Sequence, residues 1–539
     1  MTKIVHVKEI ADIERAANAG GMSYATMMEN AGANIASHLL AVYPDMSRQH
    51  ILVLVGPGNN GGDGLVASHY LRESGADVCV YLSHPREKRD PNVARVQDRM
   101  RMHCHAEDAE GTLLAAEVMT ADVVIDALLG TGFKLPMRKT IGGILSVVKR
   151  TLADKPGDTF LIAVDCPSGL DCDTGQRAHE TLRADVTITL AAAKRGHFRF
   201  PGAERVGALT VVGIGLPGDL KEMKAVDLEM FDQKDAARLL PARPKDSHKG
   251  SYGTVGVVAG SINYPGAPML AARGAYRAGA GLVCMAVPAP VQRLMAASLP
   301  EAVWTLLPHD VGVLTDNAVP VLKEQLHRMD VLVFGPGFGQ EEVTKRFVAS
   351  LFSPKEGTMK GVIGFVHDEE QTRREAVEIP PLVIDADGLR LLARMESWMD
   401  RIPDECVLTP HPGEMAELMD KPVEVIQQDR IAAAKEGAST WGQVVVLKGA
   451  FTVVAAPSGE ATVIPIATSA LATAGSGDVL SGVIAALYAQ GCGPYEAAAL
   501  GAYLHARAGE LAVARIGDEA SVLAGDIVGC LGEAFSELH

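Results

Sequence analysis

The sequence predicts an α/β protein built on mostly parallel, doubly wound sheets. Short runs such as 51–55 are apolar on both faces, which is typical of buried parallel strands. Stretches with apolar residues at helical spacing separate most of these runs, and strands that alternate with helices indicate a parallel sheet. The pattern ends near residue 225 and begins again after a polar, Gly-containing stretch at 243–253. We therefore expect two domains, at residues 1–224 and 225–539.

The first domain is expected to open with a helical segment at 7–43, where Ile10, Ile13 and Ala17 share one face. The buried strand at 51–55 runs into a Gly-rich turn at 56–64, and a helix is expected from Leu65 to about Ser74. Further strands are expected at 78–82, 123–126, 161–165, 186–190 and 209–212.

The second domain repeats the alternation of strands and helices. The residues at 444–452 predict a strand, a Lys-Gly turn and a second strand, and 354–378 has the composition of an additional surface element. Strands are expected at 254–259, 282–286, 331–334, 382–384, 407–408 and 444–447, with closing helices at about 478–490, 494–514 and 521–537.

Composition excludes several classes of protein. The 539 residues carry a net charge of −16, so a basic face for nucleic acid is not expected. No apolar run approaches the roughly 20 residues of a membrane span. The eight cysteines form no C-x-x-C pair, and Lys3 and Lys8 come too early for a secretory signal. We expect a cytoplasmic protein with reduced thiols that binds neither nucleic acid nor membrane.

The first Gly-rich turn reads Gly-Pro-Gly-Asn-Asn-Gly-Gly-Asp-Gly over 56–64. Glycines between a buried strand and a helix let backbone N–H groups approach an anion. The turn lacks the Lys of a triphosphate-binding loop, whereas Asn59, Asn60 and Asp63 offer groups that suit ribose, amide or hard-cation binding. The alternative is a tight structural turn with Asn and Asp caps.

Two more acidic residues in this half stand where a predicted strand meets its loop. Asp126 precedes a second Gly loop at 127–133, Asp165 precedes Cys-Pro-Ser-Gly-Leu-Asp at 166–171, and Lys194 follows a fourth strand. Each acid alone could be a loop anchor. Because ligands bind outside the carboxyl ends of parallel strands, these loops could instead converge on one crevice.

These motifs resemble the NAD(P)H-hydrate epimerase family over about residues 5–220. The resemblance implies a Rossmann-like domain that interconverts the R and S forms of hydrated NADH and NADPH (NADHX and NADPHX). It implies a potassium ion held by Asn60, Asp126 and Ser168. Asp165 is our candidate acid/base, with Lys194 tuning it. The expected substrate-binding residues are Asn59, Asn60, Gly61, Gly62, Asp63, Gly130, Thr131, Gly132, Phe133, Lys134, Leu135, Pro136 and Asp165.

A second Gly-rich system lies at 473–482, before an Ala- and Leu-rich helix. Gly475 and Gly477 leave N–H groups free at the helix start, where they can stabilise charge on a phosphoryl group. Asp478 can accept a proton from a hydroxyl nucleophile. The alternative is an acidic residue that the helix dipole favours. Lys448 in the predicted hairpin and His411 between two prolines stand at other strand ends.

Together with the runs at 249–253, 335–339 and 409–414, this set resembles the ribokinase-like superfamily. Within it the match is to the ADP/ATP-dependent NAD(P)H-hydrate dehydratases, over about residues 235–535. The departures are Ser476 where Thr is common and Gly388 where Ala is usual. The resemblance implies Mg²⁺ and an ADP cosubstrate. Ala267, Gly337, His411 and Asp478 would contact the hydrated dinucleotide, and Lys448, Gly449, Ala450, Phe451, Thr452, Gly475, Ser476 and Gly477 the adenine nucleotide.

The two resemblances predict a nicotinamide nucleotide repair enzyme that epimerises the hydrates and dehydrates the S form with ADP, giving AMP and phosphate. We expect a homo-oligomer. One alternative is a small-molecule kinase fused to a non-catalytic nucleotide-binding domain, and another is a metabolite-sensing binding protein. The preference for ADP over ATP and the activity of both sites stay open.

Overall fold

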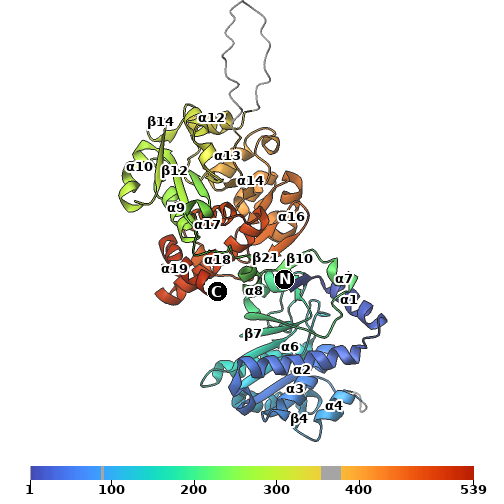
Figure 1. Cartoon of the computed structure of the whole chain (residues 1–539). Helices are drawn as coiled ribbons and strands as arrows, with labels where there is room; N and C mark the ends of the chain where they lie inside the picture. The colour runs from blue at the N-terminus through green and yellow to red at the C-terminus, as the bar shows by residue number, and fades with distance from the viewer. Residues whose placement is uncertain (1, 87–89, 354–377) are drawn as a thin grey trace, which may run out of the picture. The chain divides into compact units, whose positions relative to one another are not determined.

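The computed structural model describes residues 2–86, 90–353 and 378–539. It divides into two compact units, Thr2–Glu229 and Met230–His539 (Figure 1). The α/β class predicted from the sequence is confirmed in both units. The additional element expected at 354–378 lies, up to residue 377, outside the described residues.

The N-terminal unit is built on a seven-stranded sheet in the order β4-β3-β2-β5-β6-β7-β9, and every pairing in it is parallel. The direction of winding reverses between β2 and β5, so their carboxyl ends flank a crevice of the kind that binds ligands in doubly wound sheets. The strands are β2 His50–Val55, β3 Asp77–Leu82, β4 Arg101–Cys104, β5 Val123–Ala127, β6 Phe160–Val164, β7 Val186–Leu190 and β9 Ala208–Val212. Outside this sheet, β1 Thr2–Val5 pairs in parallel with β8 Ala193–Lys194.

Helices cover both faces of this sheet. On one face, Leu39 of α2 and Leu71 of α3 share a buried cluster with Val53, and on the other, Leu114 of α5 and Leu145 of α6 pack against the opposite side of the same strands. The helices are α1 Val7–Ala19, α2 Tyr24–Val42, α3 Asn59–Glu73, α4 Pro91–Val96, α5 Thr112–Thr120, α6 Lys139–Asp154 and α7 Lys221–Lys224.

Two helix boundaries differ from those expected. The helical segment expected at 7–43 is broken, because Gly21 has a φ of 104° and Ser23 caps the N-terminus of α2. The helix expected from Leu65 begins at Asn59, so most of the Gly-rich turn is helical. A Cβ at Gly64 would lie 2.6 Å from the Cβ of Ala127, which shows that close packing of α3 on β5 requires glycine there.

The C-terminal unit contains strands in the order β13-β12-β11-β16-β17-β18-β19-β20-β21. Pairing is parallel from β13 to β19 and antiparallel from β19 to β21. A hairpin does follow β19, but its second strand lies at 453–455, just beyond the expected range 444–452. Strand β10 Leu228–Met230 spans the boundary between the two units in the sequence. The strands that follow it are β11 Thr254–Val258, β12 Leu282–Pro288, β13 Val303–Leu307, β14 His309–Asp310, β15 Val313–Leu314, β16 Val331–Phe334, β17 Leu382–Ile384, β18 Val407–Leu408, β19 Val444–Leu447, β20 Val453–Ala455 and β21 Ala461–Val463.

Helix α17 (Ser476–Ala489) runs through the core of this unit. A Cβ at Gly482 would lie 1.9 Å from the carbonyl oxygen of Ala271 in α9, so the two helices meet backbone to backbone. This contact fixes how closely α17 packs on α9. The other helices are α8 Gln233–Leu239, α9 Gly266–Arg277, α10 Ala289–Met295, α11 Ala318–Lys323, α12 Glu342–Leu351, α13 Asp387–Ala393, α14 Pro412–Met419, α15 Val423–Gln428, α16 Arg430–Trp441, α18 Pro494–Ile516 and α19 Ala524–Ser536.

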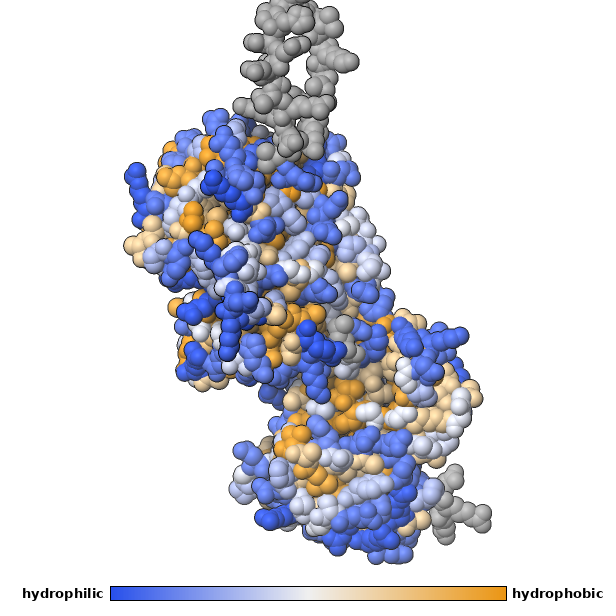
Figure 2. All heavy atoms as spheres, viewed as in Figure 1, coloured by the Kyte–Doolittle hydropathy of each residue, from blue (hydrophilic) through white to orange (hydrophobic). Residues whose placement is uncertain are grey.

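Hydrophilic residues cover most of the face drawn in Figure 2, with smaller apolar patches between them. All eight cysteines are free thiols. Within the described part of the chain, no helix combines the length and the apolar character that crossing a membrane requires.

Candidate active sites

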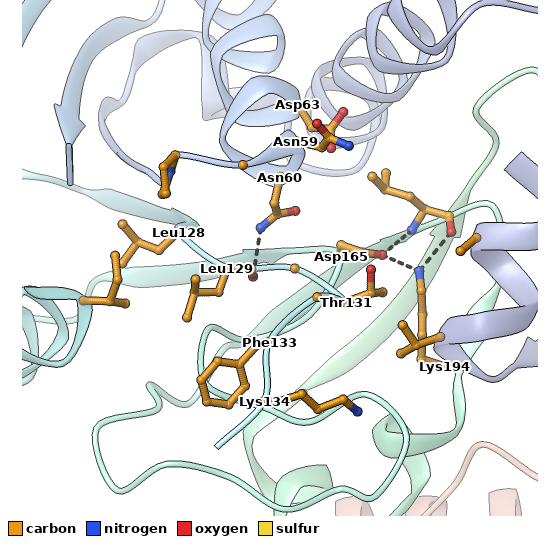
Figure 3. A pocket seen from close by; sticks show the side chains of 18 of the residues that line it. Asn59, Asn60, Asp63, Leu128, Leu129, Thr131, Phe133, Lys134, Asp165 and Lys194 are labelled. Carbon is orange, nitrogen blue, oxygen red and sulfur yellow. Dashed lines mark hydrogen bonds and ion pairs between the residues drawn. The ribbon is translucent and has the colours of Figure 1, made fainter. Parts of the chain in front are cut away.

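A pocket of about 690 Å³ opens in the N-terminal unit at the carboxyl ends of the parallel strands (Figure 3). It gathers most of the residues that the sequence assigns to substrate. Three of them are outside its lining, namely Gly61, Gly62 and Leu135. The two glycines instead pack on Gly56 and Met28 inside the unit. The predicted residues that line the pocket are Asn59, Asn60, Asp63, Gly130, Thr131, Gly132, Phe133, Lys134, Pro136, Asp165 and Lys194.

The loops that form this pocket touch one another through their backbones. A Cβ at Gly56 would lie 1.7 Å from the carbonyl oxygen of Leu128, so the loops after β2 and β5 can meet only with glycine at that position. The side-chain amide of Asn60 donates to the carbonyl oxygen of Leu129 at 3.0 Å, which ties the start of α3 to the second loop (Figure 3).

Asn60, Asp126 and Ser168 come together beside this contact. The Ser168 hydroxyl donates to Oδ1 of Asp126 at 2.6 Å, and its backbone N–H donates to Oδ2 at 2.8 Å. The backbone of Leu129 connects Asn60 to Ser168, because its carbonyl accepts from Asn60 and its N–H donates to the Ser168 hydroxyl at 2.8 Å. Oδ1 of Asn60 is buried without a hydrogen bond among the described residues. A buried amide oxygen beside a carboxylate and a hydroxyl fits a hard cation.

Asp165 and Lys194 form a buried ion pair on the opposite side of the pocket (Figure 3). Asp165 directly follows β6 with a φ of 66°, a conformation that Asp tolerates better than most residues. Its Oδ1 accepts hydrogen bonds from Lys194, from the hydroxyl of Thr189 and from the N–H of Leu190. Burial would raise the pKa of Asp165, but the charge and hydrogen bond of Lys194 outweigh it and lower that pKa. The carboxylate is therefore held ionised.

Two other carboxyl groups in the pocket have pKa values that are raised instead of lowered. Burial, together with the negative charges of Asp165 and Glu14, raises the pKa of Asp63 well above its ordinary value. Burial and Asp165 also raise the pKa of Glu14, which reaches the pocket from α1. Sequence reasoning missed Glu14. The available signal was an acidic residue four positions after Ile10, beside the apolar face of the first helix.

The second site lies in the C-terminal unit, where the N-terminus of α17 meets the connection between β19 and β20. A pocket of about 330 Å³ opens there. The predicted residues that are not part of its lining are Phe451, Gly475, Asp478, Ala267 and Gly337; the last two pack against each other. The predicted residues that line it are His411, Lys448, Gly449, Ala450, Thr452, Ser476 and Gly477.

Lys448 is the cation of this site. Its Nζ lies 2.5 Å from Oδ1 of Asp385 and 3.7 Å from Oε2 of Glu414. Burial would lower the pKa of Lys448, but these two carboxylates outweigh it and raise that pKa. A Cβ at Gly477 would lie 3.2 Å from the Lys448 Nζ, so the ion pair sits directly against the first turn of α17.

Asp478 occupies the same turn, next to the backbone N–H groups that begin α17. Burial and the negative charge of Asp385 raise the pKa of Asp478 to about 7, although Lys448 opposes the shift. A carboxyl group with a pKa near neutrality is suited to general-base catalysis. Gly475, the residue before the helix, has a φ of 87°, which turns the chain sharply into this position.

Two histidines complete the second pocket. His411 caps α14, and its Nδ1 accepts from the N–H of Gly413 at 3.0 Å, with Pro412 as the first helical residue as expected. His505 was missed because it lies inside α18 among small apolar residues. Burial lowers the pKa of His505 to about 4, and its Nε2 lies 3.2 Å from the Ser476 hydroxyl.

The fold and the two sites define a two-unit α/β enzyme with carboxylates and a lysine at the strand ends of each unit. A family model described as NAD(P)H-hydrate dehydratase matches residues 255–529, and one described as YjeF-related protein N-terminus matches residues 24–196. The chain belongs to the family of bifunctional NAD(P)H-hydrate repair enzymes. The expected α/β class is confirmed, with a doubly wound parallel sheet in the N-terminal unit and a mostly parallel one in the C-terminal unit.

Similar proteins cover nearly the whole chain. The bifunctional NAD(P)H-hydrate repair enzyme Nnr of Moorella thermoacetica is 36% identical over 97% of this chain and 95% of its own length. That of Thermofilum pendens is 36% identical over 96% of this chain and 93% of its own. The solved ADP/ATP-dependent NAD(P)H-hydrate dehydratase of Bacillus subtilis, co-crystallised with ATP and Mg²⁺, is 28% identical with a TM-score of 0.46, over 58% of this chain and 100% of that one.

Proposed function

We propose that this chain repairs hydrated nicotinamide nucleotides by two successive activities. Residues 1–224 interconvert the R and S hydrates of NADH and NADPH, and residues 225–539 dehydrate the S form with ADP as cosubstrate. Family membership supports this reading over a kinase joined to a non-catalytic domain. The observation that carries it is Asp478, a carboxyl group with a pKa of about 7 at the mouth of α17 beside Lys448.

The dehydration is proposed to begin at the C6 hydroxyl of the hydrated ring. Asp478 takes the hydroxyl proton, and the oxygen attacks the terminal phosphoryl group of ADP, releasing AMP. Lys448 and the N–H groups at the start of α17 stabilise the charge that develops on the phosphoryl oxygens. The lone pair of the ring nitrogen then expels phosphate from C6, and loss of the C5 proton restores the C5–C6 double bond. Hydroxide, a poor leaving group, is thereby replaced by phosphate.

A magnesium ion fits beside this pocket, where the carboxylates of Asp385 and Glu414 flank Lys448. Asp385, whose carboxylate lies against the first turn of α17, is the residue that would hold it together with the nucleotide's phosphates. When bound, Mg²⁺ would neutralise part of the phosphate charge. The hydrated dinucleotide would contact His411, Ala267 and Gly337. The adenine nucleotide would contact the hairpin residues 448–452.

The epimerisation is proposed to use two carboxyl groups held in opposite states. Asp63, with its raised pKa, carries a proton and gives it to the leaving C6 hydroxyl, while the ring nitrogen lone pair assists the departure of water. Asp165, held ionised by Lys194, takes a proton from the water that returns to the other face of C6. Neighbouring acids with pKa values pushed apart are a common solution for such proton transfers.

A potassium ion fits the buried oxygens of Asn60, Asp126 and Ser168 beside the epimerase pocket. Bound there, it would satisfy the orphaned amide oxygen of Asn60 and hold the two loops in place. Replacing K⁺ with tetramethylammonium at constant ionic strength is expected to lower the epimerisation rate and to leave dehydration of the S form unchanged. We also infer that the protein is cytoplasmic and forms a homo-oligomer. Light scattering of the purified chain would test the oligomeric state.

One experiment tests the whole proposal. Absorbance of NADH is followed as the full chain acts on a mixture of R and S hydrates with ADP and Mg²⁺. Recovery of the whole mixture is expected, whereas recovery of the S fraction alone would mean an inactive epimerase. Phosphate is measured in parallel, because a kinase would accumulate phosphorylated substrate and a binding protein would turn nothing over.

A further inference from the structure

A cluster of metal-ligating side chains lies in the N-terminal unit away from its pocket. The ligating atoms of Cys79 in β3, His103 in β4 and Glu117 in α5 are all within 4.8 Å of one another. His50, the first residue of β2, adds a fourth group, since its Nε2 lies 3.4 Å from Oε2 of Glu117. Cys79 is fully buried, and the other three side chains are between 12% and 24% exposed.

The sheet register explains why these residues meet. His50 pairs with Asp77, and Cys79 pairs with Arg101, so His50, Cys79 and His103 stand on the same face of adjacent strands. Helix α5 covers that face and supplies Glu117. At about 3.3 Å per residue, His50 lies roughly 16 Å along β2 from the strand end that opens into the pocket. The cluster is therefore separate from the proposed epimerase site.

The donor set has the chemistry of one particular class of ion. A thiolate, two imidazoles and a carboxylate are the ligands that Zn²⁺ takes in tetrahedral sites. Zinc bonds of 2.0–2.3 Å place ligand atoms about 3.5 Å apart, so the cluster needs to contract by roughly 1 Å. Magnesium and calcium, which prefer oxygen ligands, fit this set poorly.

In this structure, the positive charge beside the cluster is the guanidinium of Arg101. Its guanidinium donates to Glu117 at 3.2 Å and to Nε2 of His50 at 2.8 Å, so the lone pair of that imidazole is directed at this guanidinium. Arg101 also donates to the exposed Asp77 at 3.1 Å, and its side chain is 48% exposed. It can therefore move outward and keep Asp77 as its partner.

We propose that Cys79, His103, Glu117 and His50 bind one Zn²⁺ ion in exchange for the Arg101 guanidinium. The Cys79 thiol forms the Zn–S bond and releases its proton to solvent, and the two imidazoles bind in their neutral form. The ion joins three strands to α5 and stabilises this edge of the sheet. The proposal does not depend on either repair activity.

The test uses the full chain without a polyhistidine tag. Titration with Co²⁺ is expected to give a thiolate-to-metal charge-transfer band that saturates at one equivalent and is lost when Zn²⁺ is added. Cys79→Ser should abolish the band and weaken Zn²⁺ at least about tenfold in competition with a chromophoric chelator. Cys104→Ser is the matched control, because Cys104 lies next to His103 on β4 but outside the cluster; it should bind as the wild-type chain does.

Arg101→Ala separates a metal site from a simple ion-pair network. It should tighten Zn²⁺ binding, because the competing cation is gone. If the wild-type chain gives no thiolate band, or if Cys79→Ser binds Zn²⁺ as tightly as wild type, the proposal is wrong. Should Cys79→Ser fail to fold, His103→Gln decides by the same competition, with circular dichroism to establish that it is folded.

Discussion

Two opposing effects act on the carboxyl group of Asp478. Burial and the nearby Asp385 favour the neutral acid, whereas Lys448 and the N-terminus of α17 favour the carboxylate. The balance leaves a pKa of about 7, far above that of an ordinary Asp. The folded state therefore binds a proton that the unfolded chain releases near pH 4, and this difference has consequences for both activity and stability.

Asp478→Asn is expected to abolish dehydration and leave epimerisation intact. In the wild-type chain, kcat/KM for the S hydrate should fall tenfold per pH unit below about pH 7, because the base must be ionised. A raised pKa contributes stability that is complete below about pH 4 and is lost as the pH rises to about 7. Asn removes the buried charge, so its melting temperature should exceed that of wild type at pH 8 but not at pH 4.

Asp526→Asn is the matched control, since Asp526 also stands in the first turn of a closing helix of this unit but outside the pocket. It should cost at most about 1 kcal/mol of helix capping and no activity. Normal dehydration by the Asp478→Asn chain would remove Asp478 from the mechanism and leave only its favourable place in the helix dipole.

Asp165→Asn is expected to slow R-to-S conversion at least about 100-fold while the S form is still dehydrated. Asn accepts the positive φ at this position, so the loop should keep its shape. The readout is NADH recovery from the pure R hydrate, supplied with ADP and Mg²⁺. Asp185→Asn, at the other end of the sheet, removes a loop-anchoring carboxylate and should change stability but not this rate.

Lys194→Met tests whether the lysine holds Asp165 ionised. Without the cation, burial dominates and the pKa of Asp165 rises, so the acidic limb of the epimerisation profile should move to higher pH. An unpaired buried carboxylate costs about 3–5 kcal/mol, and the double variant Asp165→Asn, Lys194→Met should recover part of that stability. An unmoved pH profile would show that Lys194 does not tune the base.

Residue patterns predicted where the polar groups of both pockets would lie, because polar residues that follow buried parallel strands lie together at the carboxyl edge of the sheet. Asn60, Asp165 and Lys194 meet in one pocket for that reason. Glu14 and His505 come instead from helices whose apolar spacing indicates only a core-facing side. Which side-chain groups a helix presents to a pocket depends on packing that no local pattern contains.

The N-terminal pocket depends on the packing of helix α2 against helix α3, since α3 begins with the pocket residues Asn59 and Asn60. A Cβ at Gly32 of α2 would lie 2.4 Å from the Cβ of Val66 and 2.8 Å from the N of Ala67 in α3. Backbone atoms cannot yield as a flexible side chain can, so any side chain at residue 32 forces the helices apart.

Gly32→Ala is expected to destabilise the N-terminal unit by about 1–3 kcal/mol, through overpacking. Hydrogen exchange of the α2 and α3 peptides should quicken, and epimerisation should fall at elevated temperature, while dehydration of the S form is unchanged. Gly143→Ala in α6 is the control, because a Cβ there meets open space. It should be neutral or stabilise by about 0.5–1 kcal/mol, and equal protection in both variants would contradict the packing argument.

Element boundaries were less predictable than element types. The strand Arg101–Cys104 has no apolar run, and it is a strand because β3 offers it an edge to pair with. The short strands β20 and β21 extend the β19 hairpin in the same way. Conversely, α3 includes glycines that disfavour a helix, because only glycine permits its close approach to β5.

At the scale of the whole chain, each unit encloses its own pocket with its own elements. The alternation of strands and helices and its restart predicted this two-unit α/β fold, since that pattern reflects burial of whole layers. The net charge of −16 does not prevent binding of anionic nucleotides, because backbone N–H groups at helix N-termini provide local positive potential. Each proposed activity therefore has all of its residues within one unit.

Two chains with complementary defects should consequently act as well as one intact chain. Asp165→Asn alone should recover NADH only from the S fraction of a mixed hydrate, and Asp478→Asn alone should recover none. An equal mixture of the two, at the same concentration of intact sites as wild type, should recover the whole mixture at the wild-type rate, because the S hydrate can diffuse between chains. A blank without protein gives the uncatalysed epimerisation to subtract. A mixture much slower than wild type would mean that the S hydrate passes between the sites of one chain without release.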